Sequence, residues 1–226
     1  MDRSALRVTL VGVGAVGSAV LPLLRHPSIA RVRLIDGDTI ELANLPRQLL
    51  YHAGDAGRLK VTVAVERMVV LNPGLVLHGV PRFLDGGSTD LLADTDVVLD
   101  CCDDLHAKRL IAAHCQQAGI HLISAAVHGQ QLQVSTQVPG DRAFYSGRIT
   151  DEQATCVMRQ VPMPVIAVCA ALIVQRLQHI ADGGPAHAEV LDLLDVEHGR
   201  WMRIRQPQDP LEGELIALHH PLVPST

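Results

Sequence analysis

Three glycines and one aspartate near the start of the chain have the types and the spacing of a nucleotide-binding loop. Gly12, Gly14 and Gly17 form a G-x-G-x-x-G pattern that encloses Ala15, and Asp36 follows 19 positions after the last glycine. In such a loop the first glycine permits a tight turn, the second lets backbone N–H groups approach a phosphate, and the third allows a helix to pack closely on a strand. A carboxylate placed like Asp36 can accept hydrogen bonds from ribose hydroxyls. The pattern predicts nucleotide binding, and a glycine turn that only packs is the alternative.

The stretch after Asp36 carries polar side chains that are candidates for binding the nucleotide, namely Asp38, Asn44, Arg47, Gln48 and Lys60. The guanidinium of Arg47 can hold a phosphate through two parallel hydrogen bonds, and the ammonium of Lys60 can act as a point charge. The alternative for each cation is an ordinary solvated surface charge. Together with the glycine loop they predict a site for a nucleotide with several phosphates.

Two adjacent carboxylates follow a buried apolar run later in the chain. In the segment Leu99-Asp100-Cys101-Cys102-Asp103-Asp104, Asp103 offers a hard oxygen ligand of the kind that Mg²⁺ prefers. Asp104 could add a second metal contact or repel phosphate, while Asp100 could simply end a strand. Asp103 is therefore a candidate metal ligand.

Cys156 is the cysteine whose surroundings suggest chemistry. It lies in Thr155-Cys156-Val157, just before a long apolar segment. A thiol is a strong nucleophile once ionised, but a buried, inert cysteine is the common alternative. The other cysteines fall in strand or helix patterns and are predicted to lie in the core: Cys101, Cys102, Cys115 and Cys169. The twelve histidines show no metal-ligand spacing and are expected to be surface or satisfied core residues.

The elements that must position these residues alternate between strand and helix as far as about Ala126. Strands are predicted at Arg7–Val11, Arg31–Asp36, Leu75–Val80, Asp96–Asp100 and His121–Ala126, and helices at Gly17–Arg25, Lys60–Leu71 and Leu105–Ala118. Pro22 is expected to kink or shorten the first helix. Beyond them we expect an antiparallel strand at Gln131–Val138, a helix at Val161–Ala181, and a hairpin of Glu189–Leu194 and Arg200–Ile204. The fold class is therefore α/β: a Rossmann-like doubly wound sheet whose parallel N-terminal half continues into antiparallel C-terminal strands.

Length and composition fit one domain over residues 1–226. We divide it into a nucleotide-binding half at 1–128, an antiparallel, partner-binding half at 129–206, and a loose tail at 207–226. The formal net charge of −5 argues against nucleic-acid binding. We find no apolar run of about 18 residues, as a membrane span requires, and no signal peptide. We expect a cytoplasmic protein with reduced cysteines, and the lack of C-x-x-C pairs makes zinc unlikely.

These motifs, in this order, resemble the ThiF/MoeB/HesA family, which is related to the ubiquitin-activating enzymes. The family has a strand ending in D-x-D, then N-L-x-R-Q, a lysine about a dozen residues later, and an L-D-C-x-D-N segment. The resemblance runs from about Val8 to Arg205. It implies that Asp36 holds ribose, that Asn44, Arg47 and Lys60 hold phosphates, and that Asp103 holds Mg²⁺. It also implies that Cys156 could form a covalent sulfur link to a carrier protein.

The sequence departs from the family pattern in four respects. Many members have an N-terminal segment whose arginine reaches the ATP of a dimer partner, and only six residues precede Arg7 here. Many bind zinc through two C-x-x-C pairs, whereas the corresponding stretches here, 141–147 and 207–213, contain no cysteine. The family usually has asparagine where this chain has Asp104. The chain is also short and has no rhodanese-like domain.

The resemblance implies an ATP- and Mg²⁺-dependent adenylyltransferase. We expect it to activate the C-terminal carboxylate of a ubiquitin-like sulfur carrier protein or peptide, to release pyrophosphate, and to work as a homodimer. Three other functions stay open: a related ATP-dependent enzyme that dehydrates a small amide, an NAD-dependent oxidoreductase, and a non-catalytic partner subunit of an activating enzyme.

Overall fold

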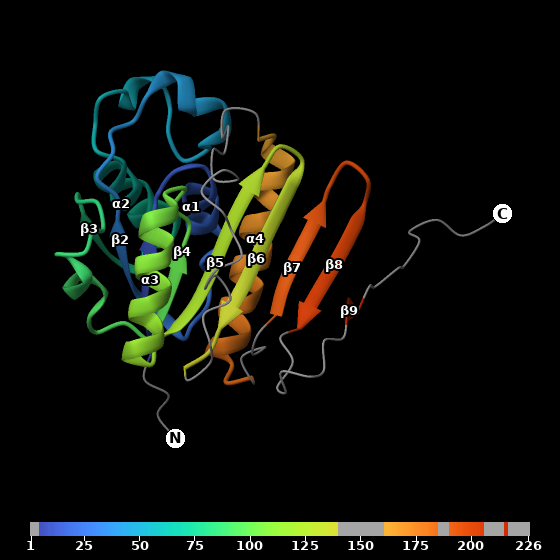
Figure 1. The fold of residues 1–226 in the computed structure, drawn as a ribbon. Coiled ribbons are helices and arrows are strands. Elements are labelled where there is room, and N and C mark those ends of the chain that lie inside the picture. Colours follow the sequence, from blue (N-terminus) through green and yellow to red (C-terminus); the bar gives the residue numbers. More distant parts are fainter. Residues whose placement is uncertain (1–4, 140–160, 185–189, 206–214, 217–226) are drawn as a thin grey trace.

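A single mixed sheet runs through the computed structural model, which describes residues 5–139, 161–184, 190–205 and 215–216. Its nine strands lie in the order β3-β2-β1-β4-β5-β6-β7-β8-β9 (Figure 1). The first five are parallel: β1 (Leu6–Val11), β2 (Ile29–Ile35), β3 (Val76–Val80), β4 (Val97–Asp100) and β5 (His121–His128). Strand β1 pairs with β2 on one side and β4 on the other. The chain therefore reverses its winding direction at β1, where ligands bind in such sheets.

The sheet continues into antiparallel strands, which confirms the predicted fold class. These are β6 (Gln131–Gln137), β7 (Val190–Asp195), β8 (Arg200–Arg205) and β9 (Leu215–Ile216). The change of direction occurs at a two-residue turn between β5 and β6, where Gly129 has a φ of +53°. A tight hairpin favours glycine at such a position because other residues rarely adopt positive φ. Of the predicted loose tail, 207–226, the structure describes only the two residues of β9.

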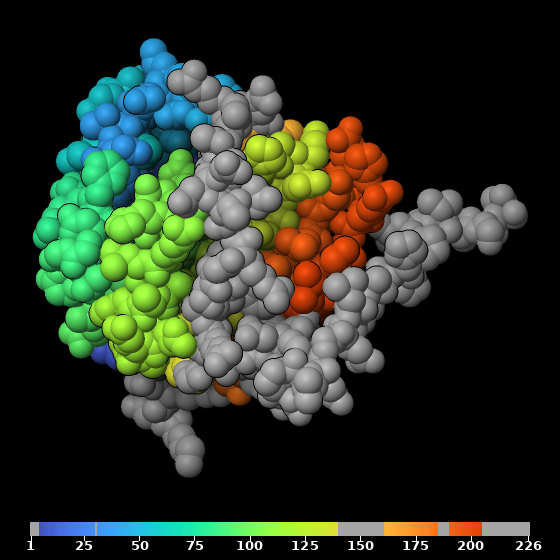
Figure 2. All heavy atoms as spheres, viewed as in Figure 1, coloured from blue at the N-terminus to red at the C-terminus, as the bar shows by residue number. Residues whose placement is uncertain are grey.

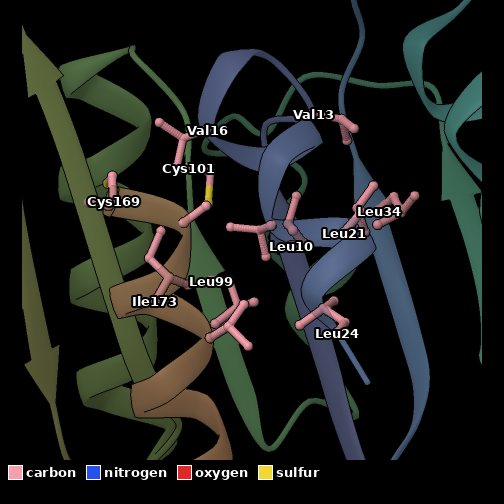
Figure 3. Close-up of a cluster of buried hydrophobic side chains, with 14 of the residues drawn as sticks. Leu10, Val13, Val16, Leu21, Leu24, Leu34, Leu99, Cys101, Cys169 and Ile173 are labelled. Carbon is pink, nitrogen blue, oxygen red and sulfur yellow. The ribbon is translucent and has the colours of Figure 1, made fainter. Parts of the chain in front are cut away.

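Helices cover both faces of the parallel half. On one face lie α1 (Ala15–Val20), α2 (Lys60–Leu71) and α4 (Met163–Ala181), whose buried side chains share one core with Leu10 and Leu99 (Figure 3). On the other face, α3 (Leu105–Ala118) packs Ile111 against Val98. Short 3₁₀ turns connect the elements: η1 (Leu21–Leu23), η2 (Leu42–Arg47), η3 (Ala53–Asp55) and η4 (Thr89–Leu92).

Most predicted elements are present with shifted ends. The first helix stops at Val20, and Pro22 lies in the 3₁₀ turn η1 that follows, as the missing N–H of proline predicts. Strand β2 begins two residues earlier than predicted, at Ile29, because Leu6 pairs with it across an irregular register. Strand β5 runs on to His128 because the hairpin with β6 extends its pairing.

No apolar run of membrane-spanning length was found in the sequence, but helix α4 is long and apolar enough to cross a membrane by length and composition alone. Its apolar residues are explained by burial inside the protein, since α4 packs against β5 and β6 (Figure 1). Val165, Ile166 and Ile173 are fully buried in the core shared with α1. The helix predicted at Val161–Ala181 is therefore present, begins at Met163, and is a core helix.

A buried ionic cluster ties α4 to the antiparallel strands. The carboxylate of Asp192 on β7 is fully buried and accepts hydrogen bonds from Arg176 of α4, from Arg203 Nε at 2.7 Å, and from Trp201 Nε1 at 2.9 Å. Arg176 also donates to Thr136 Oγ1 on β6 at 2.8 Å. Burial opposes ionisation of Asp192, but these hydrogen bonds outweigh it and hold its pKa below the usual value. The cluster links α4, β6, β7 and β8.

Gly17 is required by close contact rather than by backbone angle. A Cβ at Gly17 would lie 2.0 Å from the carbonyl oxygen of Gly12 and 3.1 Å from Leu10 Cδ2. We expect Gly17→Ala to lower the free energy of unfolding by about 1–3 kcal/mol, the usual cost of overpacking a core. Gly14→Ala is the matched control, because its Cβ would meet only Gln48 Nε2, at 3.8 Å. Urea unfolding of both variants tests this, and equal midpoints would contradict it.

Candidate nucleotide site

A cavity of about 460 Å³ opens at the carboxyl ends of the parallel strands. It lies where the winding of the sheet reverses, between the loops that follow β1, β2, β3 and β4. The structure brings eleven of the predicted site residues to its wall: Gly12, Gly14, Ala15, Asp36, Asp38, Asn44, Arg47, Gln48, Lys60, Asp103 and Asp104. Gly17 lies beneath the loop instead, packed against Gly12. Cys156 lies outside the described residues.

The glycine loop is held in place by backbone contacts. Gly12 has a φ of +86°, and a Cβ there would lie 2.9 Å from the backbone of Cys101 and Cys102. Its N–H donates to the carbonyl of Ile35 at 2.8 Å, and the phenol of Tyr51 donates to the carbonyl of Val13 at 2.9 Å. The loop after β1 thus touches the loop after β4, and only glycine fits between them.

Asp36 lies at the base of the cavity, 8% exposed. One carboxylate oxygen accepts the N–H of Val13 at 2.6 Å, and the other accepts the N–H of Asp38 at 2.8 Å. Burial raises the pKa of Asp36, against the opposing effects of Lys60 and of these hydrogen bonds. Each oxygen keeps a second lone pair, so the carboxylate is oriented by the backbone and can still accept hydrogen bonds from a ligand.

The predicted phosphate-binding cations are already oriented by neighbours. Lys60, the first residue of α2, is 5% exposed, and its Nζ lies 2.7 Å from Asp38 Oδ2. Arg47 ends the turn η2 and donates to the Oδ1 of Asn44. Gln48 is 3% exposed, and its Oε1 has no hydrogen-bond partner within the described ranges. A buried polar atom without a partner at the cavity wall fits a site that is completed by a polar ligand.

The paired carboxylates after β4 have separate roles. Asp104 is the N-cap of α3, where its Oδ1 accepts the N–H of Ala107 at 2.6 Å. Asparagine caps helices as well as aspartate does, so the departure at this position keeps the cap. Neither a metal contact nor phosphate repulsion is needed to account for Asp104. The carboxylate of Asp103 is exposed at the cavity, where a hard cation can reach it.

Several cavity residues were missed by the sequence patterns. Arg82 and Phe83 follow β3, and His106 lies in the first turn of α3. The ring of Phe83 covers Gly37, where a Cβ would lie 2.7 Å from two ring carbons. Their position after a parallel strand is the signal that could have found them, because every loop at that edge of the sheet borders the cavity.

Of the four cysteines predicted to lie in the core, three do. Cys101, Cys115 and Cys169 are buried in the core, and Figure 3 shows Cys101 and Cys169 between the strands and α4. Cys102 is instead half-buried and borders the cavity, so its prediction as a core residue is wrong in part. Its thiol donates to Asp100 Oδ1 at 2.9 Å. Burial and then the charge of Asp100 raise its pKa well above the ordinary value, so it is a poor nucleophile.

The described residues contain no group of three His, Cys, Asp or Glu side chains able to hold a metal ion by themselves. A cation such as Mg²⁺ is usually held by one or two carboxylates together with substrate phosphates. Asp103 is an exposed cavity carboxylate with no capping role, whereas the exposed carboxylate of Asp38 is paired with Lys60.

The fold and the cavity are those of a Rossmann-type nucleotide-binding protein, with a glycine loop and exposed carboxylates at the carboxyl ends of the parallel strands. The chain belongs to the ThiF family, whose model matches residues 2–213, so the resemblance found in the sequence is confirmed.

Curated relatives agree with this assignment. The chain is 32% identical over 210 residues to the molybdopterin-synthase adenylyltransferase of Escherichia coli, covering 89% of this chain and 84% of that protein. It is 30% identical over 201 residues to the ThiS adenylyltransferase of the same organism, covering 86% and 80%. We therefore classify the chain as a ThiF-family adenylyltransferase.

Solved structures show the same fold. Escherichia coli MccB with the peptide derivative MccA-N7isoASN superposes with a TM-score of 0.81 at 19% identity, covering 93% of this chain and 67% of that one. MccB with ATP superposes with a TM-score of 0.77 at 20% identity, covering 93% and 66%. The chain thus spans about two thirds of the length of MccB.

Proposed function

We propose that this chain adenylates the C-terminal carboxylate of a ubiquitin-like sulfur carrier protein or a peptide, with ATP as the nucleotide. The observation that carries the proposal is the cavity, which gathers Asp36, Asn44, Arg47, Lys60 and Asp103 at one edge of the sheet. Hydride transfer itself requires no metal ligand such as Asp103, whereas reactions at ATP phosphates are favoured by cations and a metal ion beside those phosphates. The relatives named as adenylyltransferases of a synthase and of ThiS support the same chemistry.

The reaction joins the substrate carboxylate to the α-phosphate. A carboxylate oxygen attacks the α-phosphorus of ATP, the bond from that phosphorus to the bridging oxygen breaks, and pyrophosphate leaves with the electron pair. The product is an acyl-adenylate. Charge builds on the phosphate oxygens in the transition state, and Arg47 and Lys60 are placed to stabilise it. Asp36 orients the nucleoside, because its two backbone hydrogen bonds fix its carboxylate.

Mg²⁺ would be held by Asp103 together with phosphate oxygens. When bound, it would neutralise charge on the phosphates. The exposed position of Asp103 leaves it free for this contact, while its neighbour Asp104 is engaged as the helix cap.

The face of β6, β7 and β8 that points away from α4 is suited to the carrier. Side chains alternate between the faces of a strand, and Val134 and Asp192 point towards α4. The opposite face presents apolar side chains bordered by glutamines: Leu191, Leu193, Met202 and Ile204, with Gln131 and Gln133. Met202 is 38% exposed. In Figure 2, β8 (orange-red) lies on the same face of the molecule as α3 (green). We propose that the carrier docks on this apolar strip.

Pyrophosphate exchange into ATP tests the proposal. With a carrier ending in Gly-Gly, or a peptide with a free C-terminus, we expect exchange, whereas the same substrate amidated at its C-terminus should give none. Met202→Glu should raise the KM for the carrier by about tenfold or more, the effect of about 1.4 kcal/mol at an interface, and leave the KM for ATP unchanged.

Val70→Glu is the matched control, because Val70 is 79% exposed on α2, away from the strip. Exchange that persists with the amidated substrate would contradict attack by a terminal carboxylate. Binding of NADH without binding of ATP in a calorimetric titration would favour an oxidoreductase instead. Equal KM values for the carrier in Met202→Glu and the control would remove the strip as its docking face.

A further inference from the structure

Asp100 ends β4 with a fully buried carboxylate that has four hydrogen-bond donors around it. Its Oδ2 accepts from Ser124 Oγ at 2.6 Å and from Lys108 Nζ at 3.0 Å. Its Oδ1 accepts from the backbone N–H of Cys102 at 3.2 Å and from its thiol at 2.9 Å. The donors come from α3, from β5 and from the loop that follows β4. The carboxylate therefore joins three parts of the molecule at one point.

Lys108 balances this buried charge. It lies in α3, is 5% exposed, and donates to the carbonyl of Ala125 on β5 at 2.7 Å as well as to Asp100. A buried ion pair of this kind is seldom more stabilising than two apolar side chains of similar volume. What it provides is a fixed geometry, because both ions must keep their hydrogen bonds to remain buried.

The fixed position of Asp100 also constrains the loop after β4, which carries the expected metal ligand Asp103. On one side of Asp103, the backbone N–H of Cys102 donates a hydrogen bond to Asp100. On the other side, the carboxylate of Asp104 accepts one from Ala107 in the first turn of α3. Asp103 therefore lies between two neighbours that are each held by hydrogen bonds. Its backbone has little freedom, although its side chain is exposed at the cavity.

We propose that Lys108, through its ion pair with Asp100, is a positioning residue that holds Asp103 at the place where it binds the metal. The proposal rests on the proposed function, since it assumes that Asp103 holds Mg²⁺. Lys108 touches no reacting group and acts through Asp100 and Cys102. Outer contacts of this kind commonly change metal affinity or activity by about 10- to 100-fold when they are lost.

Lys108→Met tests the proposal, because it keeps the length of the side chain and removes its charge. Asp100 then loses its balancing cation, and its hydrogen bonds with Cys102 no longer hold the loop in place. We expect the backbone amides of 101–104 to exchange hydrogen about tenfold faster or more, and Mn²⁺ to bind about tenfold or more weakly in the presence of α,β-methylene ATP. The kcat of pyrophosphate exchange should fall by a similar factor, while the KM for ATP stays the same.

Two variants serve as controls. Lys108→Arg keeps the charge and should bind Mn²⁺ with an affinity close to that of the wild type. If Lys108 contributed only packing, Lys108→Arg would not bind Mn²⁺ more tightly than Lys108→Met. Arg109→Met removes the neighbouring exposed cation of the same helix and should leave Mn²⁺ binding unchanged. If Lys108→Met does not fold, Asp100→Asn combined with Lys108→Met removes both charges and should show the same weak Mn²⁺ binding.

Wild-type Mn²⁺ affinity and wild-type amide exchange in a folded variant that lacks the ion pair would overturn the proposal. Its failure can be told from failure of the proposed function. A wild-type protein without pyrophosphate exchange would contradict the function, yet amide exchange and Mn²⁺ binding would still report whether Lys108 holds the loop.

Discussion

Replacing Asp103 by alanine should lower the rate of ATP–pyrophosphate exchange by about a thousandfold, the equivalent of about 4 kcal/mol of lost transition-state stabilisation. The reason is its position: Asp103 is exposed at the cavity and is free of the capping bond that occupies its neighbour. Binding of α,β-methylene ATP should largely survive, because Asp36, Arg47 and Lys60 are untouched. Exchange assays and calorimetric titration together measure the two effects.

Asp104→Asn is the matched control for Asp103→Ala. It removes one negative charge one residue away, but asparagine preserves the N-cap of α3, so we expect exchange close to that of the wild type. Full exchange activity in Asp103→Ala would remove Asp103 from the mechanism. An equal loss in both variants would show that the net charge of the loop matters more than the position of the carboxylate.

Replacing Asp192 by alanine should lower the free energy of unfolding by about 3–5 kcal/mol, the usual cost of breaking a buried ion pair from one side. Arg176, 5% exposed, would keep its charge in the core without its carboxylate partner, and Arg203 and Trp201 would lose their shared acceptor. Urea unfolding followed by circular dichroism measures the loss. Asp195→Ala on the same strand is the control, because its partner His198 lies at the surface, and we expect its midpoint to be almost unchanged.

The loss of unfolding free energy in Asp192→Ala should also depend on pH. The folded protein holds the pKa of Asp192 below its unfolded value, so the stabilisation is complete above the unfolded value of about 3.9 and is lost as pH falls through the folded value. The difference in unfolding free energy between wild type and Asp192→Ala should therefore be constant near neutral pH and shrink in acid. A difference that grows in acid would contradict the assignment.

The parallel half of the fold and most of the cavity were predictable because their signals are local. Gly12 and Gly14 follow an apolar run directly, and Asp36 ends the next strand, so sequence distance alone places them at one edge of the sheet. Arg47 and Lys60 were placed by their order in a family pattern. The structure brings all of them to one wall.

Other features depend on contacts between distant segments. Ser124 and Lys108 meet Asp100 only because β5 lies beside β4 and α3 packs above both, and no local pattern carries that information. The capping role of Asp104 was predictable from its place just before the predicted helix at Leu105–Ala118. From the sequence alone, only a metal contact or repulsion of phosphate was considered for this carboxylate. Cys156 keeps its predicted role as a hypothesis, because it lies outside the described residues.

The position of β1 in the middle of the sheet has a consequence for synthesis of the chain. Its partner on one side, β2, begins 18 positions after β1 ends, but its partner on the other side is β4, and the hydrogen bond between Arg7 and Asp96 spans 89 residues. At roughly 5–20 residues per second, the ribosome needs roughly 4 to 18 s to supply that second partner. During this interval one edge of β1 lacks its partner, and an unpaired strand edge is open to pairing with other chains.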